Sequence, residues 1–335
     1  MIEGVQIRTI VQSNSILSQA ALIPMNNEKK LFICVCSSGD RDTLDPCVES
    51  LRDQVVPAGY QLTILVIDNS ADALLRERFV DLPAGGLDVH CIHEPVKGIP
   101  FARNAAISYS LEAKADWIAF LDDDELAPRQ WIARLIQCHE TRSADVVVGG
   151  VQRAKTREEA IALARSFTSA ADFQRMPVVK TAVTSNVLFD ARFVREPIGL
   201  RFDEGMVFGG SDREFFMRAV MAGAKIIQAE SELVFEFWPA ERIKPIYILQ
   251  RWFRYGVSFN YRYRKNYPFG KALLLVWLMC FFKLGSAILK GLLFPLRVFI
   301  DKRPIHRVAS ASVADVAYAA GCVAPFFGFR LGKYY

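Results

Sequence analysis

Four acidic residues in succession, Asp122 to Glu125, directly follow the apolar run "WIAFL" at 117–121. Neighbouring carboxylates repel one another, and burying them without a counter-charge costs free energy. A metal ion, a basic neighbour or bulk water could each relieve this repulsion. Because an acidic run alone is more often a solvated turn, its meaning depends on the elements around it.

The acidic run is one of three polar clusters that each follow an apolar segment. Apolar runs at 31–36, 62–67, 87–94, 116–121 and 145–150 alternate with helical spacing at 43–55, 72–82, 100–114 and 127–140. Strands that are apolar throughout predict an α/β fold with a Rossmann-like, mostly parallel sheet flanked by helices. In such sheets ligands bind beyond the carboxyl ends of the strands, where "CSSGDRD", "DNSAD" and "DDDE" fall. We therefore expect these clusters to form one site.

A second candidate lies in "FDEGMVFGGSDREFF" at 202–216. Gly209 and Gly210 predict a flexible turn, Ser211 can cap the helix that follows, and Asp212 falls in the first turn of that helix. Asp212 is either a residue that stabilises the helix start or a general base held at a pocket. The local pattern leaves both interpretations open.

From residue 241 the chain becomes basic, aromatic and apolar. Residues 271–300 are long and apolar enough to cross a bilayer, yet Lys283, Lys290 and Arg297 recur every seven residues on one helical face. A buried core helix would need acids to pair with this stripe, and this region lacks them. The pattern favours attachment to a membrane, and spanning or lying in the interface stays open. The segment 314–329 is expected to be a second surface-bound helix.

Several other classes of protein are disfavoured. No nucleic-acid recognition motif accompanies the net charge of +5, so no nucleic-acid partner is expected. The seven cysteines lack metal-ligand spacing, and the N-terminus lacks the pattern of a signal peptide. We expect reduced thiols and a catalytic part in the cytoplasm.

The ordered set "ICVCSSGDR", "VIDNS", "KGIPFARNAAI", "FLDDDE", "TSNVLF" and "GGSDREFFMRAVMAGAKI" resembles family 2 inverting glycosyltransferases of the GT-A fold. The tail, with "WPAERIKP", "QRWFRYG" and "GFRLGKYY", resembles the membrane-associated bacterial enzymes of exopolysaccharide assembly, the succinoglycan type. The resemblance covers roughly 31–335. It implies transfer of one sugar from a nucleotide-sugar donor to a polyprenyl-diphosphate-linked saccharide at the cytoplasmic face of the bacterial inner membrane, and it favours a UDP-sugar as the donor. The absence of a Q-x-x-R-W motif favours a single addition over processive polymerisation.

The resemblance also implies roles for individual residues. Asp124 would bind Mn²⁺ or Mg²⁺, Asp212 would be the catalytic base, and Arg251 with Trp252 would close the donor pocket or meet the acceptor. The residues expected at the nucleotide are Cys36, Asp68, Arg103, Asp122 and Asp123. Those expected at the membrane are Lys283, Lys290 and Arg297.

The expected organisation has four parts: an extension (1–30), a nucleotide-sugar half (31–150), an acceptor half with the base (151–240) and membrane-associated helices (241–335). Two rival functions remain. A metal-dependent phosphotransferase predicts a nucleophilic Asp at the end of the first strand, where the sequence has "CVCSS". A degenerate glycosyltransferase serving as a membrane scaffold predicts loss of Asp124 or Asp212, and both are present.

Overall fold

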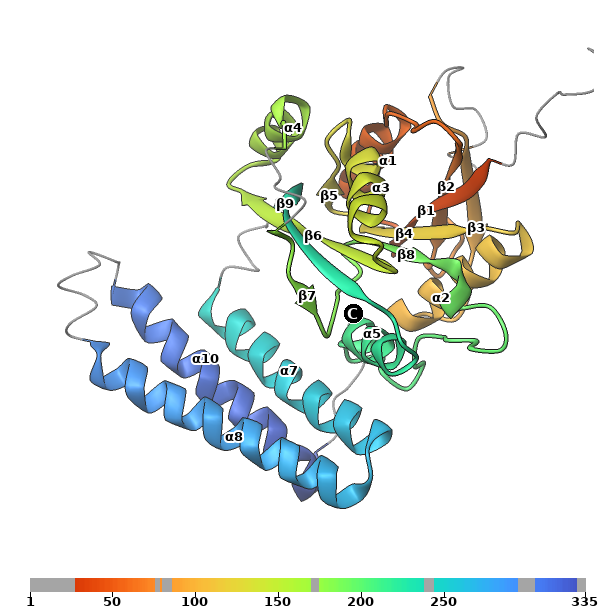
Figure 1. Cartoon of the computed structure of the whole chain (residues 1–335). Coiled ribbons are helices and arrows are strands. Elements are labelled where there is room, and N and C mark those ends of the chain that lie inside the picture. Colours follow the sequence, from red (N-terminus) through yellow and green to blue (C-terminus); the bar gives the residue numbers. More distant parts are fainter. Residues whose placement is uncertain are drawn as a thin grey trace, which may run out of the picture.

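The computed structural model of the chain describes residues 28–75, 79, 86–169, 175–237, 244–294 and 305–329. Within these residues, an α/β body built on one sheet lies beside long helices from the C-terminal part (Figure 1). The expected α/β fold is confirmed. The expected extension falls almost wholly outside the described residues.

The first half of the sheet is parallel, as the apolar runs predict. Its strands are β1 (Lys29–Ser37), β2 (Tyr60–Asp68), β3 (Val89–His93) and β4 (Trp117–Asp122), in the order β3-β2-β1-β4. The register pairs Cys36 with Asp122 and Ser37 with Asp68. The three polar clusters therefore emerge at the same edge of the sheet.

The second half of the sheet is mixed, which the sequence pattern did not indicate. β8 (Asn186–Asp190) runs antiparallel between β4 and β6 (Val146–Ala154), and β6 pairs in parallel with β9 (Ile226–Phe237). The short strands β5 (Glu125–Leu126) and β7 (Val178–Val179) pair antiparallel with β9. The boundary expected between residues 150 and 151 lies inside β6, because both halves share this one sheet.

Helices cover both faces of the sheet because successive residues of each strand point to opposite sides. Leu31, Ile33 and Val35 share one core with α1 (Arg41–Arg52) and α3 (Trp131–Arg142). Phe32 and Cys34 share the other with α2 (Ile99–Glu112) and α5 (Ser211–Met221). α4 (Arg157–Ser166) packs on β9, and η3 (Ala191–Phe193) follows β8. The helix expected at 72–82 lies largely outside the described residues.

The C-terminal helices form a bundle of their own. α7 (Pro245–Asn266) and α8 (Phe269–Leu292) both pack against α10 (Ile305–Val323), which continues into η4 (Ala324–Phe327) (Figure 1). α7 and α10 approach closely at two glycines: a Cβ on Gly256 would lie 2.1 Å from the carbonyl oxygen of Tyr318, and one on Gly321 would lie 2.0 Å from that of Phe253. Any side chain at either glycine would force the two helices apart.

The basic stripe of α8 faces inward, which corrects one expectation. Lys283 and Lys290 share a helical face with the buried residues Val276, Cys280 and Ala287. Both ammonium groups contact the carboxylate of Asp315 on α10, Lys283 at 2.9 Å. The premise that this region offers no acid to the stripe is wrong, because Asp315 supplies one across the bundle. Arg297 lies outside the described residues.

Candidate active site

The carboxyl ends of β1, β2 and β4 bring the expected nucleotide residues together, and Asp68 is the most deeply buried carboxylate among them. Its side chain is fully buried, and its two oxygens accept the backbone N–H groups of Ser70 at 3.0 Å and Leu75 at 2.8 Å. Asp68 thus stabilises the loop after β2. Each oxygen keeps a further acceptor site, and the expected contact of this carboxylate with a nucleotide base stays a prediction.

Asp122, the last residue of β4, lies beside a cation. Nη2 of Arg103, from α2, is 3.7 Å from its Oδ1, and the Arg103 side chain is only 12 % exposed. Burial is the main reason that the pKa of Asp122 is raised to about 7; Arg103 opposes this shift, and Asp124 and Asp123 add to it. Because 46 % of the Asp122 side chain is exposed, water moderates these interactions.

Two further carboxyl groups of the acidic run also have raised pKa values. Burial, above all, raises the pKa of Asp123 to about 6, although a hydrogen bond with Ser37 opposes the shift. Glu125 is buried and accepts the backbone N–H of Asp122 at 3.2 Å; burial and then Asp122 and Asp124 raise its pKa. Glu236 on β9 pairs in register with Glu125 and adds to that shift.

Carboxylate oxygens are suitable ligands for Mg²⁺ or Mn²⁺, so the chemistry of the acidic run fits a divalent cation. Among the described residues, however, no three His, Cys, Asp or Glu side chains converge closely enough to hold a metal ion by themselves. A bound ion would therefore need further oxygens from a substrate.

The thiols near the acidic run are poor nucleophiles. Burial is the first cause of the raised pKa of Cys36, although Arg103 opposes the shift. Cys47, fully buried on α1, donates to the carbonyl oxygen of Asp122 at 3.6 Å, and burial and then Asp123 raise its pKa. Protonated thiols at these positions pack and donate hydrogen bonds.

Asp212 lies in the first turn of α5, as the sequence predicts, but Ser211 does not cap the helix. The helix begins at Ser211 itself, and its N-cap is Gly210, which has the left-handed φ of +85°. The charge of Asp212 is also among those that raise the pKa of Asp122. Two carboxylates 90 positions apart in the sequence are thus brought within electrostatic range.

Helix α7 holds the start of α5 in place. Oγ of Ser258 donates to the carbonyl oxygen of Gly209 at 2.8 Å. Nε of Arg251 donates to the hydroxyl of Tyr255 at 2.7 Å. Trp252 packs within the bundle against Tyr255 and Tyr318. Arg251 and Trp252 thus contact tyrosines that line a cavity with Asp212 but do not line it themselves, and their expected role at the donor or acceptor stays a prediction.

Residues that the sequence reasoning missed line a small cavity of 80 Å³ beside Asp212. The aromatic and basic composition of "YRYRK" at 261–265 is the available signal, but the same composition is typical of helices at a membrane surface. The lining residues are Val183, Gly210, Asp212, Arg213, Tyr255, Ser258, Arg262 and Tyr318.

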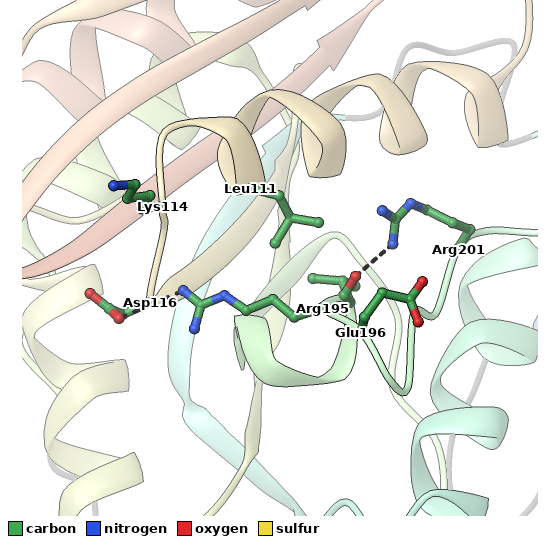
Figure 2. A pocket seen from close by; sticks show the side chains of 7 residues that line it. Leu111, Lys114, Asp116, Arg195, Glu196 and Arg201 are labelled. Atoms are coloured by element: carbon green, nitrogen blue, oxygen red, sulfur yellow. Dashed lines mark hydrogen bonds and ion pairs between the residues drawn. The ribbon is translucent and has the colours of Figure 1, made fainter.

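A larger cavity, of 520 Å³, lies near the opposite edge of the sheet (Figure 2). It is lined by residues that precede β4 and follow η3, including Lys114, Asp116 and Arg195. Nη2 of Arg195 lies 3.7 Å from Oδ1 of Asp116 (Figure 2). Neither the acidic run nor the residues at the start of α5 line this cavity. Its larger volume therefore does not make it a candidate for the catalytic site.

Comparisons with known proteins agree with this architecture. Residues 31–196 match the model of the family "Glycosyl transferase family 2". The chain is 32% identical over 238 residues to the succinoglycan biosynthesis protein ExoM of Rhizobium meliloti (strain 1021), covering 69% of this chain and 74% of that protein.

Solved structures show the same fold. The mannosyltransferase PcManGT from Pyrobaculum calidifontis, in complex with GDP-Man and Mn²⁺, has a TM-score of 0.57 at 15% identity over 88% of this chain and 87% of that one. S. aureus TarS has a TM-score of 0.51 at 14% identity over 91% of this chain and 56% of that one. With the identity to ExoM and the family match, these findings establish that the chain belongs to glycosyltransferase family 2 and has the GT-A fold.

Proposed function

We propose that this protein is an inverting, metal-dependent glycosyltransferase. It moves a single sugar from a nucleotide-sugar donor, a UDP-sugar, to a polyprenyl-diphosphate-linked saccharide at the cytoplasmic face of the bacterial inner membrane. The observation that carries the proposal is the acidic run at the carboxyl edge of the sheet, where Arg103 lies 3.7 Å from Asp122 and the charge of Asp212, at the start of α5, also reaches Asp122. The similarity to ExoM supports a place in exopolysaccharide assembly.

The acidic run suits the departing nucleoside diphosphate. When the sugar–phosphate bond breaks, negative charge develops on the diphosphate oxygens. Asp124 would hold Mn²⁺ or Mg²⁺, and the ion would supply charge that neutralises these oxygens. Arg103, held near Asp122 and against the ring of Phe202 at 5.5 Å, offers a fixed cation to the same oxygens.

Asp212 suits the role of general base. An acceptor hydroxyl that attacks the anomeric carbon in line must lose its proton on the face opposite the leaving group. Asp212 accepts that proton, the bond between acceptor oxygen and sugar forms as the sugar–diphosphate bond breaks, and a single displacement inverts the anomeric carbon. Such a base contributes on the order of 10²–10⁴ in rate.

The outer face of α8 suits a membrane. Within the described residues, Phe269–Leu292 is the one helix long and apolar enough to cross a bilayer, with a mean hydropathy of 2.2. Leu274, Leu278, Phe281, Ile288 and Leu292 share one face and are all more than half exposed. Lys283 and Lys290 lie on the other face, and Lys271 stands at the N-terminal end of the helix over the ring of Tyr267, so the apolar face beyond the first turn is available for the lipid.

Donor binding to the detergent-purified protein tests the proposal. Calorimetry with UDP, GDP and CDP, with Mn²⁺ and with a chelator, would compare wild type with Asp124→Ala. Asp53→Ala is a matched control, because that side chain is 73 % exposed and lies outside the site. We expect UDP binding that needs both Mn²⁺ and Asp124 and is unchanged in the control. Folded wild-type protein that binds none of the three nucleotides in Mn²⁺ would overturn the transferase assignment and favour a scaffold.

A further inference from the structure

The small cavity beside Asp212 is built from two cations on different elements. Arg213 follows Asp212 on α5, and Arg262 projects from α7. Tyr318 of α10 completes the wall, so the cavity lies where the α/β body meets the bundle. Asp212 is therefore shared by this cavity and by the electrostatic environment of the acidic run.

Neither arginine has a carboxylate ion-pair partner in the part of the chain that the structure describes. Arg213 lies over the ring of Tyr255 at 5.3 Å, and Arg262 lies over the rings of Phe259 and Tyr263, each at 5.5 Å. Arg218, one turn further along α5, makes two 2.7 Å bonds to Glu214 instead. Aromatic contacts position a guanidinium plane while leaving its N–H donors free for a ligand.

The two cations share one electrostatic environment. Burial is the main cause of the lowered pKa of Arg262; Arg213 lowers it further, and Asp212 opposes the shift. Two guanidinium groups against one carboxylate leave a positive excess beside the proposed base. An anion with several oxygens, such as a phosphate group, satisfies both guanidinium groups at once.

We propose that this cavity binds a phosphate group of the lipid-linked acceptor, with Arg213 and Arg262 as its ligands. This inference rests on the proposed function and adds the place at which the acceptor is held. The diphosphate of the donor belongs at the acidic run, which contributes no residue to the cavity. The bundle that supplies Tyr255, Arg262 and Tyr318 to the cavity also carries the exposed apolar face of α8, so one bundle offers both a charged site and an apolar surface.

Binding to vesicles tests the assignment without requiring turnover. Wild type, Arg213→Gln, Arg262→Gln and Arg262→Lys would be titrated with phosphatidylcholine vesicles containing polyprenyl diphosphate. Parallel titrations would use vesicles containing phosphatidylglycerol, and inorganic diphosphate in solution. Arg264→Gln is the control, because Arg264 lies on the same helix but lines a different cavity.

Each Gln variant is expected to weaken polyprenyl-diphosphate binding about tenfold, as the loss of a charge-assisted hydrogen bond does. Arg262→Lys should lose less, inorganic diphosphate should bind more weakly to the Gln variants than to wild type, and Arg264→Gln should match wild type. Phosphatidylglycerol binding should be unchanged in all variants. Wild-type affinity for polyprenyl diphosphate in both Gln variants would overturn the inference. So would an equal loss for phosphatidylglycerol, since the arginines would then serve general attachment to anionic lipid.

The same preparations separate this inference from the proposed function. UDP binding in Mn²⁺ should be intact in the arginine variants, because the acidic run lies elsewhere. Intact UDP binding with wild-type lipid affinity overturns only the acceptor site. If the wild-type protein does not bind UDP in Mn²⁺, the proposed function itself is overturned.

Discussion

Replacing Asp315 with Asn should destabilise the helical bundle. The carboxylate is 3 % exposed and accepts from Lys283 at 2.9 Å, from Oγ of Ser286 at 2.8 Å and from Lys290. Removing one partner of a buried ion pair costs about 3–5 kcal/mol. Because the lysine side chains retain 20% and 28% exposure, they can reach some water, and we expect a loss of about 2–3 kcal/mol in the free energy of unfolding.

Denaturant unfolding of the detergent-purified protein, followed by tryptophan fluorescence, measures this loss. The matched variant is the triple change Asp315→Leu, Lys283→Met, Lys290→Met, which removes all three charges and keeps similar volumes. We expect it within about 1 kcal/mol of wild type, because apolar replacement of a whole buried network is often neutral. An Asp315→Asn cost below about 0.5 kcal/mol would refute the reasoning and show that water already solvates this network.

Three further predictions concern the site and the sheet. Because the pKa values of Asp122 and Asp123 are raised to about 7 and 6, the folded chain binds more protons than the unfolded chain between the ordinary carboxyl range and pH 7. Without metal, Tm should therefore fall as pH rises from 5 to 7.5, while Mn²⁺-dependent UDP binding should rise; a flat Tm would contradict this. Gly210→Ala would place a Cβ 2.8 Å from Cβ of Ser258 at a left-handed φ, so we expect at least a tenfold lower kcat with unchanged UDP affinity; wild-type kcat would show that the α5 start tolerates displacement. Asn186→Leu should cost roughly 3 kcal/mol in urea unfolding, because the buried side-chain amide loses three hydrogen bonds; a cost below 1 kcal/mol would mean that water replaces them.

Sequence by itself determined the elements and the chemistry of their ends. Strand assignments such as 31–36 and 116–121 succeeded because apolar runs of that length are local patterns that report burial on both faces. The convergence of the clusters at residues 36 and 122 followed from one topological rule, since parallel strands present their carboxyl ends at one edge. The position of Asp212 in a first helical turn was equally local.

Only the tertiary structure decided which partners these groups meet. The burial of Asp68 depends on how its loop folds back onto the carboxylate, and the inward direction of Lys283 depends on Asp315, 32 positions away. Arg262 and Arg213 line one cavity only because α7 packs against the start of α5. Such contacts arise from packing between elements distant in the chain, and neither hydrophobic periodicity nor motif spacing encodes which charged side chain faces which.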